Sequence, residues 1–193
     1  MAAPDLTAPV LLLAMPQVAD PFFRKSVVLL LAHEEEGSFG FIVNRTTELK
    51  VVDILRDLDI SWTGAPGMLA RFGGPVQPQV GTLLFAPDAA SPALPGSAEV
   101  LPGVRVSQNL SELAVLAGAP PDRFRLLLGY AGWGAGQLVE EILRNDWLTA
   151  PVDLDIVFGD DPDAAWEKAL ASVGVDSRTL PAWTAAEGEA APN

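Results

Sequence analysis

Glycines crowd the segment GYAGWGAGQ at residues 129–137, between an apolar run and a helix-like run. A strand, a glycine-rich turn and a helix N-terminus together form a common anion-binding geometry, because free backbone N–H groups point outward there. Gly132 and Gly134 fit the first two positions of the dinucleotide fingerprint G-x-G-x-x-G, but Gln137 occupies the third. A P-loop needs Lys and then Ser or Thr, where this chain has Gln137 and Leu138. The pattern therefore favours glycine used for positive φ and close packing, with an anion-binding turn as the alternative.

Other side chains could complete a binding surface around this segment. Trp133 lies between two glycines, and a Trp exposed there would be a contact for a partner. Asn44 and Arg45 follow an apolar run and could bind a carboxylate or phosphate, although an Asn that caps a turn is the commoner case. In the anion-binding alternative, Arg45 or Arg71 lies near the N–H groups of residues 134–137. The candidate residues for a ligand or partner surface are Asn44, Arg45, Gly73, Gly74, Gly132, Trp133, Gly134, Gly136 and Gln137.

The residue types needed for catalysis are scarce. The chain has no cysteine, which excludes thiol catalysis, disulfides and zinc–thiolate sites, and its one histidine is His33. Three glutamates follow His33, and because neighbours on an extended segment point to opposite faces, the four cannot converge on one metal. No serine lies in a G-x-S-x-G elbow, and Ser38 lacks that pattern. We therefore name no catalytic residue, metal or cofactor. Whether the protein is an enzyme stays open, and the residues favour a protein that is not an enzyme.

Charge and hydropathy exclude several classes of partner. The formal net charge is −13, and the twelve basic residues are scattered, so we expect no direct binding of nucleic acid. No apolar run approaches the roughly 20 residues of a membrane helix, so we expect no membrane contact. The N-terminal apolar run has no basic residue before it and is a poor signal peptide, which predicts a cytoplasmic protein.

The hydrophobic pattern predicts a single domain over residues 1–183 and a disordered tail over residues 184–193. Strands are expected at residues 10–14, 26–32, 39–43, 80–86, 98–101, 123–128 and 152–158. Helices are expected at residues 49–60, 110–117 and 137–144, and after Asp161-Pro162. Asn109 is the expected N-cap of the second helix, with Glu112 completing a capping box.

These segments together resemble the YqgE/AlgH family of bacterial proteins. The resemblance covers residues 10–158 and rests on MPQVADPFFRKSVVLLLAHEEEGSFGFIVNR, FGGPV and LGYAGWGAGQLVEEILRNDWL, in the family's order. It implies an α/β (α+β) fold in which a curved mixed sheet forms a barrel-like core flanked by helices. It also implies a cytoplasmic protein without an established activity, some members being described as transcriptional regulators. After Gly74-Pro75-Val76 the family tends to carry an acidic–basic pair, where this chain has QPQVG.

No helix-turn-helix with a basic recognition helix can be identified, and the negative charge opposes direct DNA contact. The first hypothesis is therefore a non-enzymatic regulatory or interaction protein, an indirect transcriptional regulator, that binds an unidentified protein partner around the glycine segment. The alternative hypothesis is a binding module or enzyme for a small anionic or nucleotide-like ligand held at the glycine-rich turn.

Overall fold

The computed structural model describes residues 6–89 and 91–183, which form an α+β fold. The chain divides into two compact units, the first comprising residues up to Asn44 and from Gly132 onward, the second comprising Arg45–Ala131. The boundary at residue 131 falls inside strand β9 (Arg123–Gly134). The single domain expected over residues 1–183 stays a prediction, and the expected tail at 184–193 lies outside the described residues.

The first unit is built on an antiparallel sheet of apolar strands. Its order is β10 (Trp147–Ala150), β1 (Val10–Ala14), β2 (Val27–Glu34) and β3 (Gly37–Ile42). The runs LLLA of β1 and VVLL of β2 are fully buried, as expected for strands covered on both faces. The helical segments of the unit are α3 (Gln137–Leu143), α4 (Leu154–Val157), α5 (Pro162–Ser172) and the 3₁₀ turn η1 (Ser177–Thr179). Trp166 fixes α5 to the sheet, because its Nε1–H donates to the carbonyl of Ala14 at 2.9 Å.

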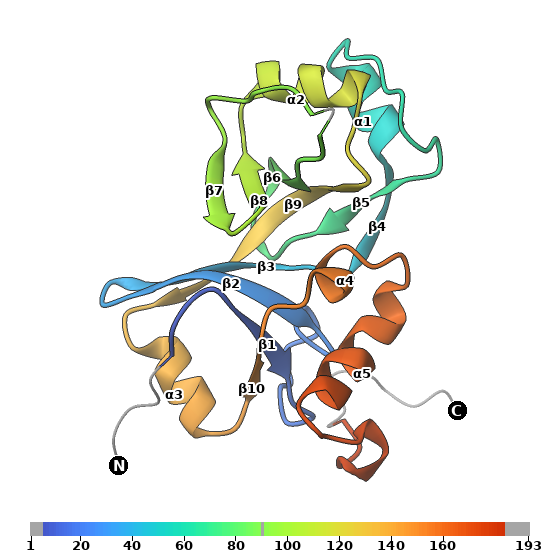
Figure 1. The fold of residues 1–193 in the computed structure, drawn as a ribbon. Helices are drawn as coiled ribbons and strands as arrows, with labels where there is room; N and C mark the ends of the chain where they lie inside the picture. The colour runs from blue at the N-terminus through green and yellow to red at the C-terminus, as the bar shows by residue number, and fades with distance from the viewer. Residues whose placement is uncertain (1–5, 90, 184–193) are drawn as a thin grey trace. The chain divides into compact units, whose positions relative to one another are not determined.

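The second unit contains a curved mixed sheet. Its order is β4 (Thr46–Lys50), β5 (Leu69–Phe72), β9, β6 (Val76–Ala86), β8 (Val104–Ser107) and β7 (Ala98–Leu101). β5 and β9 run parallel and the other pairs are antiparallel. Figure 1 shows these strands curling, with α1 (Val51–Asp57) and α2 (Leu110–Gly118) at the same end of the unit. The barrel-like core flanked by helices that the resemblance implies is thereby confirmed.

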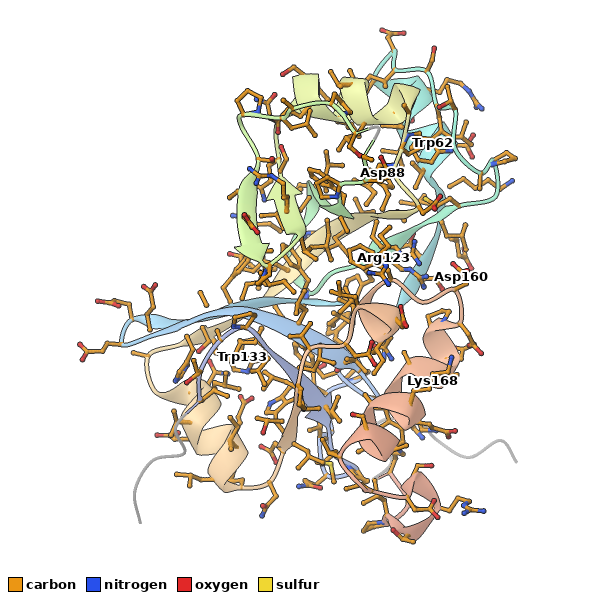
Figure 2. The ribbon with its side chains drawn as sticks, viewed as in Figure 1. Trp62, Asp88, Arg123, Trp133, Asp160 and Lys168 are labelled. Atoms are coloured by element: carbon orange, nitrogen blue, oxygen red, sulfur yellow. The ribbon has the colours of Figure 1, made fainter. Side chains whose placement is uncertain are left out.

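The core of the second unit explains why its helices form where they do. Val51 and Leu55 of α1 and Leu116 of α2 are fully buried in one cluster that includes Phe124 of β9. Trp62, labelled in Figure 2, packs on Phe124 with 5.4 Å between the ring centroids. Burial of one stripe on each helix, rather than intrinsic propensity, fixes these two short helices in place.

The predicted elements that differ from the structure include one strand and the start of one helix. The strand expected at residues 152–158 is wrong: α4 lies there, with Asp153 as its N-cap accepting from the N–H of Asp155. An alternating pattern of four or five residues also fits one helical turn, and an Asp that caps this turn decides between the two. The helix expected from residue 49 begins at Val51, because residues 46–50 form β4. Leu49 is therefore a strand residue, half-exposed at the edge of the unit.

No helix within the described ranges is long and apolar enough to cross a membrane.

Candidate functional site

The glycines before residue 131 allow two backbone segments to approach closely. Gly129 has a φ of +72°, and a Cβ built on it would lie 2.3 Å from the carbonyl oxygen of Gly74. Gly74 has a φ of +152°, and a Cβ there would lie 2.1 Å from the carbonyl carbon of Tyr130. The N–H of Gly73 donates to the carbonyl of Leu128 at 2.8 Å. These contacts leave no space for a ligand between the two segments, so packing accounts for these glycines.

Strand β9 continues through Gly132 to Gly134, so only the end of the glycine segment is a turn. Gly136 is the N-cap of α3, with a φ of +73° and nothing within 4 Å of a built Cβ. The N–H of Gly134, one of the expected anion donors, donates to Oε1 of Gln137 at 3.0 Å. The helix that follows has seven residues, too short for a strong N-terminal dipole. Anion binding at this turn stays a prediction, and the geometry does not strengthen it.

Trp133 is buried, contrary to the expectation of an exposed partner contact. Its side chain is 6% exposed and packs between Phe23 and Trp147, with ring centroids 6.1 and 5.8 Å away. The indole N–H groups of Trp133 and Trp147 both donate to Oε2 of Glu141 at 2.8 Å, and Gln137 donates to Oε1 at 2.8 Å. Because side chains alternate along β9, exposed Gly132 and Gly134 put Trp133 on the buried face, beside α3 (Figure 2).

A cavity of about 250 Å³ adjoins this aromatic cluster. Its lining includes Gly132, Trp133 and Gln137, so the structure brings these three predicted residues together. The charged residues that line it are Asp20, Glu141, Arg144 and Asp146. The one cation, Arg144, is already paired with Asp146 at 2.9 Å. The carboxylates of Asp20 and Glu141 remain beside this neutral pair and disfavour an anionic ligand here.

The side chain of Asn44 and the backbone of Arg45 each bond to the backbone of another segment of the chain. Asn44 accepts from the N–H of Val27 at 2.7 Å and donates to the carbonyl of Lys25 at 2.9 Å. The carbonyl of Arg45 accepts from the N–H of Phe72 at 2.8 Å. The side chain of Asn44 therefore ties its segment to residues 25–27, at the start of β2, and ligand binding by Asn44 and Arg45 stays a prediction.

The structure pairs a serine with the histidine, which the sequence had not suggested. His33 and Ser38 are cross-strand partners on β2 and β3, with 2.7 Å between Nδ1 and Oγ. Ser38 is only 8% exposed, and neither residue lines a cavity described here. A nucleophile–base pair also needs a group that orients the base and space for the substrate. The pair is therefore a cross-strand hydrogen bond. Among the described residues, no group of three or more His, Asp or Glu side chains is arranged for a metal ion.

The largest of the cavities described here lies in the second unit, between α1 and α2, and we call it the α1–α2 groove. Its volume is about 710 Å³. The antiparallel register of β6 and β9 pairs Gly81 with Leu128 and Leu83 with Leu126, and residues two apart on a strand share a face. All four line the groove and form its floor. The pair Leu83 and Leu126 contributes two side chains to the floor. The pair Gly81 and Leu128 contributes only one, so the floor has a gap at Gly81.

The walls of the groove combine apolar and polar side chains. From β4, α1 and the residue after α1 come Glu48, Leu49, Lys50, Asp53, Ile54, Asp57 and Leu58; from β6, α2 and the residues before α2 come Gln79, Val80, Gln108, Asn109, Leu110 and Leu113. Three leucines at the rim are about half-exposed: Leu49 at 53%, Leu58 at 45% and Leu110 at 54%. A concave apolar site of this size with a polar margin is typical of a binding site.

Hydrogen bonds hold α2 in place along the groove. Asn109 caps the helix, accepting from the N–H of Ser111 at 2.9 Å, which confirms the predicted N-cap. The predicted capping box is wrong: the buried carboxylate of Glu112 accepts instead from the N–H of Gly96 at 2.6 Å and from the hydroxyl of Ser107. Glu112 therefore ties α2 to the loop before β7 and to the end of β8. A wall fixed in this way gives the groove a defined shape before any ligand binds.

Sequence reasoning missed the groove. The helix predicted at residues 49–60 includes Leu58, but α1 ends at Asp57 and Leu58 is half-exposed. Two signals were available: a glycine at residue 81 inside a strand pattern, which often marks a gap or close approach, and an apolar residue at 110 in the exposed first turn of a helix.

One carboxyl group outside these regions has a clearly shifted pKa. The side chain of Arg178 donates to Asp176 and lowers the pKa of that carboxyl from 3.8 to about 2. Asp176 is the N-cap of η1, so the pair stabilises a local turn rather than a reacting group.

Comparisons with known proteins agree with the fold just described. Residues 11–178 match a protein family described as AlgH-like. A UPF0301 protein of Ruegeria pomeroyi is 43% identical over 92% of this chain and 97% of its own length. A UPF0301 protein of Methylococcus capsulatus is 41% identical over 88% of this chain and 90% of its own.

Two solved structures are similar to this chain. The solution structure of the AlgH protein from Pseudomonas aeruginosa has a TM-score of 0.74 at 32% identity and covers 91% of this chain and 93% of that one. The crystal structure of protein DIP2367 from Corynebacterium diphtheriae has a TM-score of 0.68 at 21% identity, over 88% of each chain, and shows the shared fold alone. None of these descriptions states an activity. The chain belongs to the AlgH-like family, as the resemblance of its glycine segment predicted.

Proposed function

We propose that this chain is a non-enzymatic regulatory protein of the cytoplasm that binds an apolar partner in the α1–α2 groove. The observation that carries the proposal is the cavity of about 710 Å³ with three half-exposed leucines at its rim. Apolar surface left in contact with water costs free energy, at roughly 25 cal/mol per Å², and an occupant that covers it recovers that free energy. Covering the three exposed leucines therefore favours binding at this site.

The contacts of the glycine segment favour the α1–α2 groove as the binding site over the surface around Trp133 that the sequence predicts. Trp133 is buried and its indole N–H is satisfied by Glu141, so it offers little to a partner. The cavity beside it is smaller and carries three carboxylates, which disfavours the alternative of a small anionic ligand. The negative net charge continues to oppose DNA contact, so a regulatory role is expected to act through the bound partner.

The proposal is tested with a neutral solvatochromic dye such as Nile red, titrated against the whole chain. We expect one dye to bind per chain with a blue-shifted emission. Leu110→Ser, at the rim, should weaken binding about fivefold, since roughly half of a leucine's transfer free energy, about 1 kcal/mol, is lost. Val115→Ser is the matched control: it is an apolar residue of the same helix, 47% exposed, and does not line the groove.

Absence of dye binding would overturn the proposal. So would equal weakening by the two variants, because the dye would then be reading general surface hydrophobicity. Circular dichroism and a thermal melt of each variant show that it is folded before its affinity is compared.

A further inference from the structure

The exposed rim of the α1–α2 groove indicates an occupant larger than the cavity. A small ligand seated on the floor formed by Leu83 and Leu126 is surrounded by walls and does not cover their outer edge. Leu49 and Leu110, from β4 and α2, are more than half-exposed at that edge. An occupant that fills the cavity and also covers these leucines must extend beyond it, as a segment of a protein does.

The secondary structure around the groove favours a helical segment. The floor is the face of a sheet, whose backbone N–H and C=O groups are engaged in the ladder of β6 with β9. The walls include helices α1 and α2. An extended peptide laid on this floor would find the backbone groups of the paired parts of β6 and β9 already engaged, whereas a helix satisfies its own N–H and C=O groups internally. A helix laid in a groove is an established mode of recognition, with apolar anchors at positions i, i+3, i+4 and i+7.

Charge is distributed unequally between the two sides of the groove. The side formed by β4 and α1 carries Glu48, Lys50, Asp53 and Asp57, whereas the side formed by β6 and α2 has only amides, at Gln79, Gln108 and Asn109. Asp53 is paired with Arg56 at 2.9 Å. The remaining charges on this side are two negative, Glu48 and Asp57, and one positive, Lys50, so this side of the groove carries a net negative charge. The net charge of −13 on the whole chain adds a negative field of longer range.

Building on the proposed function, we propose that the occupant is an amphipathic helix of a partner protein with Lys or Arg along the flank that faces Glu48 and Asp57. Its apolar face fills the cavity over Gly81 and covers the leucines of the rim. Its basic flank pairs with the acidic margin formed by β4 and α1. The polar side chains on the opposite side of the groove are all uncharged amides. The charge asymmetry therefore also determines which flank of the bound helix lies against β4 and α1.

The test uses two designed helical peptides of about 15 residues with the same leucines at i, i+3, i+4 and i+7. One carries lysines on its flanks and the other glutamates. Fluorescence anisotropy with the full chain measures both affinities at low and high salt. We expect the lysine peptide to bind at least about tenfold more tightly, and this ratio to shrink as salt rises. Leu110→Ser should lower the affinity for the lysine peptide, and this loss would show that the peptide binds in the groove.

The charge contribution is isolated by the double variant Glu48→Gln, Asp57→Asn, which should reduce the ratio between the two peptides about threefold or more. The double variant Glu99→Gln, Asp122→Asn is the matched control, because both residues are exposed in the same unit and do not line the groove. It removes two negative charges from the general field and should leave the ratio nearly unchanged.

The outcomes separate this inference from the proposed function. Equal affinity of the two peptides, or tighter binding of the glutamate peptide, would overturn the basic partner and leave the groove as a binding site. A lysine peptide insensitive to Leu110→Ser would show binding by net charge alone and would also overturn it. If Nile red binds the groove but neither peptide does, the helical occupant is wrong and a small apolar ligand takes its place. If neither dye nor peptide binds, the proposed function itself fails.

Discussion

The glycine segment of β9 and the α1–α2 groove differ in how visible they are in the sequence and in what they offer a ligand. Around Gly129 and Trp133 the sequence is dense in unusual residues, yet the structure fills this region with backbone contacts and a buried aromatic cluster. Around Gly81 and Leu110 the sequence is unremarkable, yet the structure leaves a cavity of about 710 Å³ and exposed leucines.

This difference shows that a segment rich in glycine and tryptophan can serve packing rather than binding. A glycine in a strand marks a backbone constraint, and a Trp beside it marks the side chain that the constraint makes room for. Both are needed for the fold, and neither requires a ligand. A binding groove, by contrast, is made by residues that are missing, such as the side chain absent at Gly81, and by leucines that the fold leaves uncovered.

The largest effect expected is that of Gly129→Ala. Its Cβ would lie 2.3 Å from a backbone oxygen of Gly74, which cannot move without shifting β9 or the segment before β6. We expect a loss of about 4 kcal/mol or more of unfolding free energy in urea denaturation, or failure to fold. Gly136→Ala is the matched control, with nearly the same φ but open space around its Cβ, and should cost only about 1 kcal/mol. Similar costs for both would remove the distinction between a packing glycine and a turn glycine.

A smaller effect is expected from Glu141→Ala. The substitution leaves the indole N–H groups of Trp133 and Trp147 without their acceptor, at a cost of about 2 kcal/mol in the same denaturation experiment. Glu140→Ala, at an exposed residue of the same helix, should change stability by about 0.5 kcal/mol or less. If Glu141→Ala proved neutral, the aromatic cluster would not be the packed element described here, and a role as a partner surface would regain support.

The smallest effect concerns Asp176, whose shifted pKa belongs to neither region. Arg178 holds the pKa of this carboxyl at about 2, so ionised Asp176 stabilises the fold fully above pH 3.8, and this contribution is lost as the pH falls through about 2. In Arg178→Gln, the Asp176 carboxyl carbon should titrate closer to 3.8 in an NMR pH series. An unchanged midpoint would show that the backbone N–H of residue 178 alone sets the pKa.

The sequence predicted most of the strands because continuous apolar runs such as residues 26–32 leave few alternatives to burial in a sheet. It failed at residues 152–158, where a short alternating pattern is compatible with a capped turn of helix. The candidate site was harder to predict, because the exposure of Leu58 depends on where α1 ends and the gap at Gly81 depends on the register of β6 with β9. The end of α1 and the register of β6 with β9 are both determined by contacts between residues distant in the sequence. A local hydrophobic pattern does not contain this information.

Binding in the groove and binding at the glycine turn are distinguished by comparing Gly81→Phe with Gly136→Asp in the same Nile red titration. A Cβ at Gly81 would lie 3.4 Å from Leu126, an ordinary contact, and the cavity of about 710 Å³ that Gly81 lines offers space for the phenyl ring of Gly81→Phe. Gly136→Asp instead adds a carboxylate at the glycine turn and leaves the groove unchanged. We expect Gly81→Phe to abolish dye binding, with a melting temperature no lower than that of the unmodified chain, and Gly136→Asp to retain full affinity. Loss of binding in Gly136→Asp, with Gly81→Phe still binding, would contradict binding in the groove and return the site to the glycine segment.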